Sequence, residues 1–206
     1  MRLEPKGIAR ILDFDIEVRP MAFYGGDFTT GQPTAIAWKF IGEFSGVECR
    51  LIGESFDTRR VFDEEIAMLE AFRAAYDQAD IVTGHYVRGF DLPTLNGRMM
   101  RHGLPLLGTK LVQDTKGDLG RATKMSKSQE NLGAMFELKH PKVPMNTTLW
   151  EVGNALVPEG IEATRRRVIG DVEQHIELRA TMLRRGYLGA PRAWSPNGGL
   201  TPQYLP

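Results

Sequence analysis

The 206-residue chain lacks the features that mark several classes of protein. It has a single cysteine, Cys49, so no disulfide can form within the chain, and a reducing compartment is the simpler expectation. No apolar run approaches the roughly 18 residues needed to cross a bilayer, and the N-terminus lacks the apolar core of a signal peptide. These absences predict a cytoplasmic protein without a membrane partner.

The chain also has no net charge, because 26 lysines and arginines balance 26 aspartates and glutamates. The total charge therefore gives no steering toward nucleic acid, and any such steering must be local. The sequence shows neither the Cys/His spacing of a zinc site nor a glycine loop that would cradle phosphates. Candidate chemistry therefore rests on carboxylates and on local groups of basic and aromatic side chains.

The composition is that of an ordinary globular protein, with 42% hydrophobic and 25% charged residues. We predict one domain over residues 1–185 and an irregular tail, rich in proline and glycine, over residues 186–206. Periodicity and turn residues predict strands at 8–18, 34–41, 46–52, 81–84 and 111–115, and helices at 62–79, 92–102, 128–137, 147–155 and 160–185. This order predicts an α/β fold with a mixed five-stranded sheet flanked by helices.

The first predicted strand carries two carboxylates on one face. Apolar and polar residues alternate there, so Asp15 and Glu17 leave the same side, roughly 7 Å apart along the strand. The apolar neighbours indicate a strand near the centre of the sheet, where a carboxylate is costly to bury unless it is paired or bound to metal. The alternative is a pair of charges that face solvent.

Two further aspartates stand at defined places. Asp91, in GHYVRGFD, follows a short buried strand and precedes a helix, where it could simply cap the helix. Asp171 lies in the last predicted helix, on a polar stripe with Arg167 and His175 at spacings of four residues. A solvated stripe, in which Asp171 pairs with these two neighbours, is the alternative interpretation.

Taken together, the acidic residues resemble the DEDD family of 3′→5′ exonucleases, the ribonuclease H-like group that includes the proofreading domains of DNA polymerases. Asp15 and Glu17, in LDFDIE, match its first motif, Asp91 matches the second, and Asp171, in VIGDVEQHIEL, matches the third. The resemblance covers roughly residues 8–185. It implies a ribonuclease H-like fold and a hydrolase that releases nucleoside monophosphates from the 3′ end of a strand.

The resemblance also implies two divalent cations, Mg²⁺ or Mn²⁺, about 3.5–4 Å apart. Such cations prefer oxygen ligands and share them with water and phosphate. Asp15 would bridge both ions, and Glu17 and Asp171 would complete the site of the ion that activates water. Asp91 would support the second ion.

Two positions depart from the family pattern. DEDD enzymes carry a tyrosine four residues, or a histidine five residues, before the last aspartate, and these positions hold Arg167 and Arg166. Arginine stays protonated and is a poor general base. His175, one turn beyond the aspartate, is the substitute candidate, although it also fits an ordinary packing histidine. Tyr86 stands where the second motif normally has asparagine.

Substrate contacts are predicted around the same motifs. Phe23 and Tyr24, in the loop after the first strand, are candidates to stack on bases. Tyr86, Arg88 and Arg167 are the further candidates, the arginines as partners for phosphates. Hydrophobic packing and solvated charge are the alternatives for these residues.

The leading hypothesis is a stand-alone exonuclease acting on the 3′ end of single-stranded DNA, with RNA as the other substrate. Any proofreading or repair would then involve a polymerase partner in trans. The missing histidine or tyrosine motivates an alternative, a catalytically weak or silent nucleic-acid-binding module of the same fold. A third hypothesis is a nuclease of this fold with a structure-selective or RNA-directed specificity.

Overall fold

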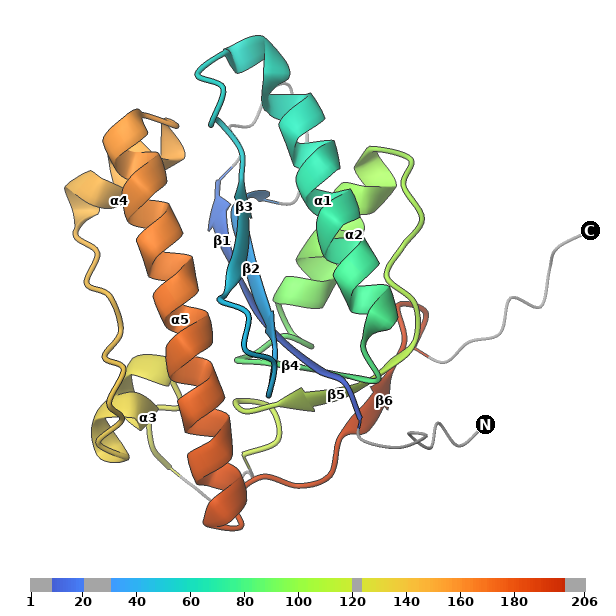
Figure 1. The fold of residues 1–206 in the computed structure, drawn as a ribbon, viewed down its shortest axis with the longest axis vertical. Helices are drawn as coiled ribbons and strands as arrows, with labels where there is room; N and C mark the ends of the chain where they lie inside the picture. Colours follow the sequence, from blue (N-terminus) through green and yellow to red (C-terminus); the bar gives the residue numbers. More distant parts are fainter. Residues whose placement is uncertain (1–8, 21–30, 120–123, 199–206) are drawn as a thin grey trace, which may run out of the picture.

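The computed structural model describes residues 9–20, 31–119 and 124–198. A mixed six-stranded sheet lies between two layers of helices (Figure 1). The strands are β1 (Ile11–Arg19), β2 (Gln32–Phe40), β3 (Glu48–Leu51), β4 (Ile81–Gly84), β5 (Lys110–Asp114) and β6 (Arg192–Trp194). The helices are the 3₁₀ turn η1 (Thr58–Arg60), α1 (Val61–Gln78), α2 (Asp91–Arg101), α3 (Gln129–Met135), α4 (Thr147–Asn154) and α5 (Pro158–Arg184).

The strand order is β3-β2-β1-β4-β5-β6. β1, β2 and β3 pair in antiparallel fashion, whereas β4 and β5 continue the sheet parallel to β1. The prediction of an α/β fold with a mixed sheet is therefore confirmed. None of the described helices is long and apolar enough to cross a membrane.

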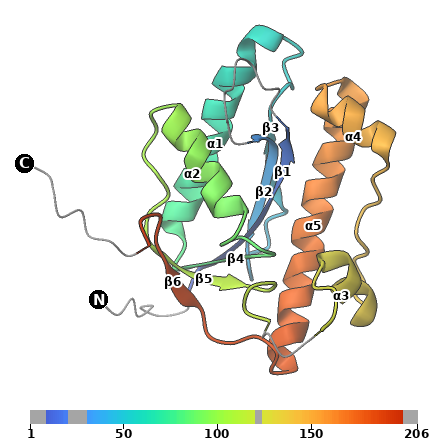
Figure 2. The same cartoon turned by 180° about the vertical axis from the view of Figure 1, so that it is seen from behind.

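Helices α1 and α2 cover one face of the sheet and α5 covers the other, as Figures 1 and 2 show from opposite sides. The apolar face of β1 packs on α1, where the rings of Phe14 and Phe72 lie 4.8 Å apart between centroids. The opposite face of β1 carries Asp13, Asp15 and Glu17 and turns toward α5. The alternation predicted for this strand is thus confirmed, and it places the acidic side chains beneath a helix.

The polar stripe of α5 faces the sheet, so the alternative interpretation, in which the stripe is solvated, does not hold. Asp171, His175 and Arg179 are buried. The sheet supplies polar partners for them, since His175 contacts Asp13 and the Nε–H of Arg179 donates to Gln113 at 2.8 Å. A buried polar face is stable only where each group finds such a partner.

The sheet has six strands rather than the predicted five. The additional strand, β6, lies in the segment 186–206 that is predicted to be irregular, and it pairs antiparallel with β5 at the edge of the sheet. Three residues are too few to show a period-2 pattern, so the sequence carries no signal for this strand. Trp194 of β6 packs against the main hydrophobic core and fastens the segment to the domain.

Candidate active site

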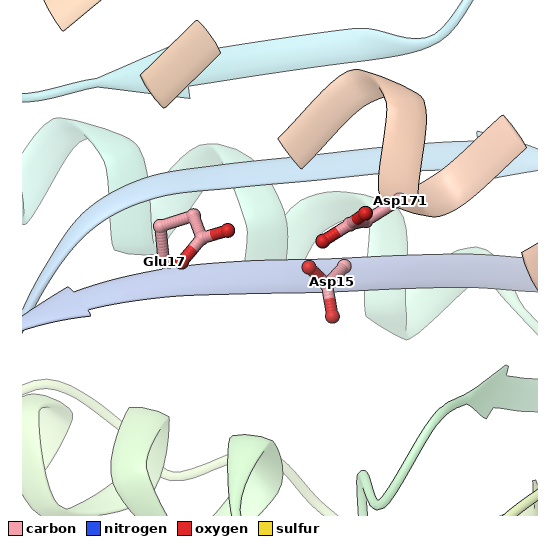
Figure 3. A group of neighbouring side chains, drawn as sticks. All are labelled: Asp15, Glu17 and Asp171. Carbon is pink, nitrogen blue, oxygen red and sulfur yellow. The ribbon is translucent and has the colours of Figure 1, made fainter. Parts of the chain in front are cut away.

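Three carboxylates from distant parts of the chain converge where α5 crosses β1. Asp15 and Glu17 come from β1 and Asp171 from α5, and each offers an oxygen within 4.8 Å of the others (Figure 3). Asp171 is only 3% exposed, and the other two side chains are half-buried. The three residues assigned to the water-activating side of the site are therefore brought together.

Asp91 stands on the other side of β1, at the first residue of α2. Its carboxylate is buried and is held by the backbone N–H of Ile16, between the two acidic residues of the strand. It is not among the three carboxylates that lie within 4.8 Å of one another, but its charge acts on Asp15. Asp91 thus stands apart from the other three carboxylates, and the family resemblance implies a supporting role for it.

Crowding makes the carboxylates hard to ionise together. Burial raises the pKa of Asp15 well above its usual value, and the charges of Asp91, Asp171 and Glu17 raise it further. Burial, followed by repulsion from Asp171, raises the pKa of Glu17 to about 7, and burial raises that of Asp91 to about 8. A cation at this place would stabilise the ionised forms.

The donor set fits a hard divalent cation. The Oδ1 atom of Asp171 is buried and has no hydrogen-bond partner within the described part of the chain. A buried carboxylate oxygen without a donor is costly, and Mg²⁺ or Mn²⁺ prefers oxygen ligands of this kind. In an ion-pair network that served only to stabilise the fold, this oxygen would accept a hydrogen bond. Its lack of a donor therefore favours a cation-binding site.

Two cations of the chain also reach the carboxylates. The Nε atom of Arg167 lies 2.9 Å from Oδ2 of Asp171 and 3.5 Å from Oε1 of Glu17. These contacts are ion pairs rather than directed hydrogen bonds, because the Nε–H points at neither oxygen. Lys142 places its Nζ 3.4 Å from the same Oδ2. The sequence pattern gave no signal for Lys142, since it lies in a segment without periodicity.

Lys142 is delivered by a strap, residues 139–146, that joins α3 to α4 and is fastened along α5. The carboxylate of Glu177 accepts the backbone N–H of Lys139 at 3.0 Å. At Gly170 the strap comes so close that an added Cβ would lie 2.7 Å from Val143. Contacts with one helix thus hold the lysine beside the carboxylates.

The second motif forms a loop organised by Asp114, at the end of β5. Its carboxylate accepts the backbone N–H groups of Tyr86 and Arg88, at 3.0 and 3.1 Å. Tyr86 has a φ of +72°, a conformation that asparagine adopts more readily than tyrosine. Its ring is 44% exposed, with Nζ of Lys116 4.1 Å from the ring centroid. The Tyr86 ring is therefore exposed to solvent on this loop.

Two of the predicted substrate contacts have other partners. The Arg88 guanidinium pairs with Asp118 and fastens the loop, so it is not available as a free phosphate ligand. Arg167 lies among the carboxylates, as described above. Phe23 and Tyr24 lie outside the described residues.

His175 does not stand where a general base would be needed. Its side chain is buried, with Nδ1 2.7 Å from Asp13 and Nε2 2.9 Å from the Thr115 hydroxyl. Because both ring nitrogens have partners, neither is left to accept a proton from water at the carboxylates. The expected substitute for the family's histidine or tyrosine is thus a buried structural residue.

A cavity of about 490 Å³ opens beyond the end of β1. Its wall includes Arg19, the last residue of β1, and the exposed rings of Phe56 and Phe62. Phe56 has a φ of +56°, which is strained for a residue with a side chain. Exposed aromatic rings thus line a cavity at the end of the strand that carries Asp15 and Glu17.

Two comparisons relate the chain to DNA polymerases of family B. Residues 42–136 match the model of the exonuclease domain of DNA polymerase family B, a segment that contains Asp91 but none of the other three acidic residues. No curated protein matches the chain. The fold is similar to that of the family B DNA polymerase from the hyperthermophilic archaeon Pyrobaculum calidifontis, with a TM-score of 0.60 and 20% identity over 86% of this chain.

The chain spans about a quarter of the length of that polymerase, since the match covers 25% of it. The segment that matches the family model excludes the motif positions in β1 and α5. The fold and the family match both agree with the resemblance that those motifs indicate, and they identify the chain as similar to a family B polymerase exonuclease domain, in keeping with a DEDD-type exonuclease of the ribonuclease H-like superfamily.

Proposed function

We propose that the chain is a metal-dependent exonuclease that removes nucleotides from the 3′ end of single-stranded nucleic acid. The observation that carries this proposal is the convergence of Asp15, Glu17 and Asp171, with one buried oxygen of Asp171 left without a partner. The three residues come from the two motifs that lie outside the segment matching the polymerase exonuclease family. The geometry of the carboxylates and the match to the family model therefore support the same activity, and they do so through different parts of the chain.

The roles of the side chains follow from their positions. A bound divalent cation would supply an activated water and stabilise the leaving oxygen of the phosphodiester. Asp15, Glu17 and Asp171 hold that cation, and Asp91 supports the site from the start of α2. No histidine or tyrosine of the described residues hydrogen-bonds to the three carboxylates, so we assign no side chain as general base.

Lys142 is the residue best placed to contact the substrate phosphate. Its ammonium reaches the carboxylates from the strap, opposite the sheet, and its side chain is partly exposed. A lysine in this place offers a mobile positive charge to a phosphate oxygen. It would bind and orient the phosphodiester rather than take a proton from water.

Single-stranded DNA is the proposed substrate, because the family that matches the chain is the exonuclease domain of DNA polymerases. The exposed ring of Tyr86 and the rings of Phe56 and Phe62 are proposed to stack on bases. A polymerase acting in trans is the proposed partner for proofreading. Stacking on aromatic rings tolerates any base, which suits an exonuclease without sequence preference.

Cleavage of labelled strands tests the proposal. Oligonucleotides labelled at the 3′ or 5′ end are incubated with Mg²⁺, Mn²⁺ or EDTA, beside the Asp15→Asn variant. We expect metal-dependent shortening from the 3′ end that the variant lacks. Binding without cleavage under every metal would favour the silent binding module, and faster cleavage of RNA than of DNA would favour an RNA-directed nuclease.

A further inference from the structure

We propose that Arg167 takes the place of one of the two divalent cations expected at the site, so that the protein without substrate binds a single divalent ion there. This inference rests on the proposed metal site. It concerns the number of ions, which the sequence resemblance set at two.

The contacts place the guanidinium between two ligands of the same ion. Arg167 and Asp171 are four residues apart on α5, so their side chains share a face. The Nε atom lies 2.9 Å from Asp171 and 3.5 Å from Glu17. These are the two carboxylates that the resemblance assigns to the water-activating ion. The guanidinium therefore occupies Oδ2 of Asp171 and Oε1 of Glu17, and it leaves Oδ1 of Asp171 for the single remaining ion.

The guanidinium is anchored rather than drawn in from solvent. Its Nη1 group donates a hydrogen bond to the backbone carbonyl of Val143, in the strap. The Arg167 side chain is only 13% exposed. A long exposed arginine loses conformational entropy when it is fixed in one place, but here the fold has already fixed it. Displacing it from the carboxylates requires breaking its contact with the strap.

The charges of the site leave room for one divalent ion. When ionised, Asp15, Glu17, Asp91 and Asp171 carry four negative charges, which two divalent ions would balance. Arg167 and Lys142 already contribute two positive charges, and an arginine guanidinium keeps its charge in proteins. The remaining negative charge equals that of one divalent ion. A second ion would therefore enter a site that is already neutral.

The structural alternative is that Arg167 swings aside whenever metal binds. Its side chain would then act as a replaceable counter-ion, and two ions would bind as in the family pattern. The two possibilities differ in the number of divalent ions bound per chain, which can be measured without substrate and without catalysis.

Counting bound Mn²⁺ tests the inference. Metal-stripped protein is titrated with Mn²⁺, and the bound ions are counted by calorimetry and by electron paramagnetic resonance. We expect one ion per wild-type chain, and two, with the spectrum of a spin-coupled pair, in Arg167→Gln and in Arg167→Tyr. Arg166→Gln removes an exposed arginine next in sequence and should still bind one ion.

Two ions in the wild type, or one ion in both Arg167 variants, would overturn the inference. A wild-type count of two overturns the inference even where a variant does not fold. A protein that binds no ion would overturn both this inference and the proposed function. A protein that binds ions but cleaves no strand would contradict the proposed function alone, while the count would still decide the role of Arg167.

Discussion

The Nδ1 atom of His175 lies 2.7 Å from Oδ2 of Asp13, at one end of a buried chain of hydrogen bonds beneath the carboxylates. At the other end, Nε2 of His85 must donate to the carbonyl of Lys127, so its Nδ1 accepts the hydroxyl proton of Thr115. The Thr115 oxygen then accepts Nε2–H of His175. A single proton is left between His175 and Asp13, and it binds α5 to β1 directly below the candidate site.

Replacing His175 by leucine should therefore destabilise the fold rather than remove a catalytic base. Asp13 would be left buried without its partner, at a cost of about 3–5 kcal/mol in the free energy of unfolding. Urea denaturation measures this loss. Adding Asp13→Leu to the variant should recover part of it, because the buried carboxylate that lost its histidine partner is then removed. Lost cleavage with unchanged stability would instead assign catalysis to His175.

Asp15→Asn should abolish cleavage and yet stabilise the metal-free protein. The substitution removes the buried carboxylate whose pKa is raised by burial and by three acidic neighbours. Relief of that repulsion should add about 1–2 kcal/mol to the free energy of unfolding in EDTA. Thermal denaturation should also lose its dependence on Mn²⁺. Asp63→Asn, on the exposed face of α1, is the control and should retain both cleavage and the response to Mn²⁺.

The metal-free protein should lose stability as the pH rises from about 5 to 8. Folding raises the pKa of Glu17 from 4.5 to about 7 and that of Asp91 from 3.8 to about 8. The folded state then binds more protons than the unfolded state over this range, so the free energy of unfolding falls with rising pH.

The affinity for Mn²⁺ should change in the opposite direction, because the ion competes with these protons. Urea denaturation in EDTA and Mn²⁺ titrations at four pH values measure both trends. Stability in EDTA that rises over this interval would contradict the raised pKa values. A Glu17→Gln variant should show a shallower slope than the wild type.

The sequence predicted which carboxylates share a face better than it predicted the residues that surround them. Asp15 and Glu17 could be placed because the period of a strand fixes which side chains share a face. Helix periodicity likewise grouped His175 with its neighbours, but it cannot tell what a helical face packs against, so a solvated stripe stayed open as the alternative. Lys142 could not be found, since contacts distant in sequence position the strap. β6 was missed because three residues carry no periodicity.

Loosening the contact between the strap and α5 should weaken cleavage, and replacing Lys142 should have the same effect. Glu177→Ala removes the acceptor for the backbone N–H groups of Lys139 and His140, at a cost of about 1 kcal/mol in stability for each lost bond. We expect kcat/KM to fall at least severalfold in this variant and in Lys142→Met. Glu173→Ala, exposed on the same helix, is the control. Normal kcat/KM in Glu177→Ala beside a defective Lys142→Met would show that the strap does not position the lysine.

The strained aromatic residue at the cavity should contribute to strand binding and not to folding. Phe56 is 68% exposed and has a φ of +56°, so Phe56→Gly removes the ring while relieving the backbone strain. Thermal stability should be kept or raised. Loss of one stacked base should weaken the binding of a single strand by roughly tenfold, within the 1–3 kcal/mol that such a contact contributes.

Fluorescence anisotropy of a labelled oligothymidylate, measured in the Asp15→Asn background so that the strand stays intact, follows this affinity. Phe44 provides a matched control, because it is fully exposed in the turn between β2 and β3, at the end of β1 opposite the carboxylates. Phe44→Gly should bind the strand as the parent does. Equal losses at Phe44 and Phe56 would mean that exposed apolar surface, rather than the cavity beside Arg19, accounts for the binding, and the path of the strand would have to be sought on the Tyr86 side of the carboxylates instead.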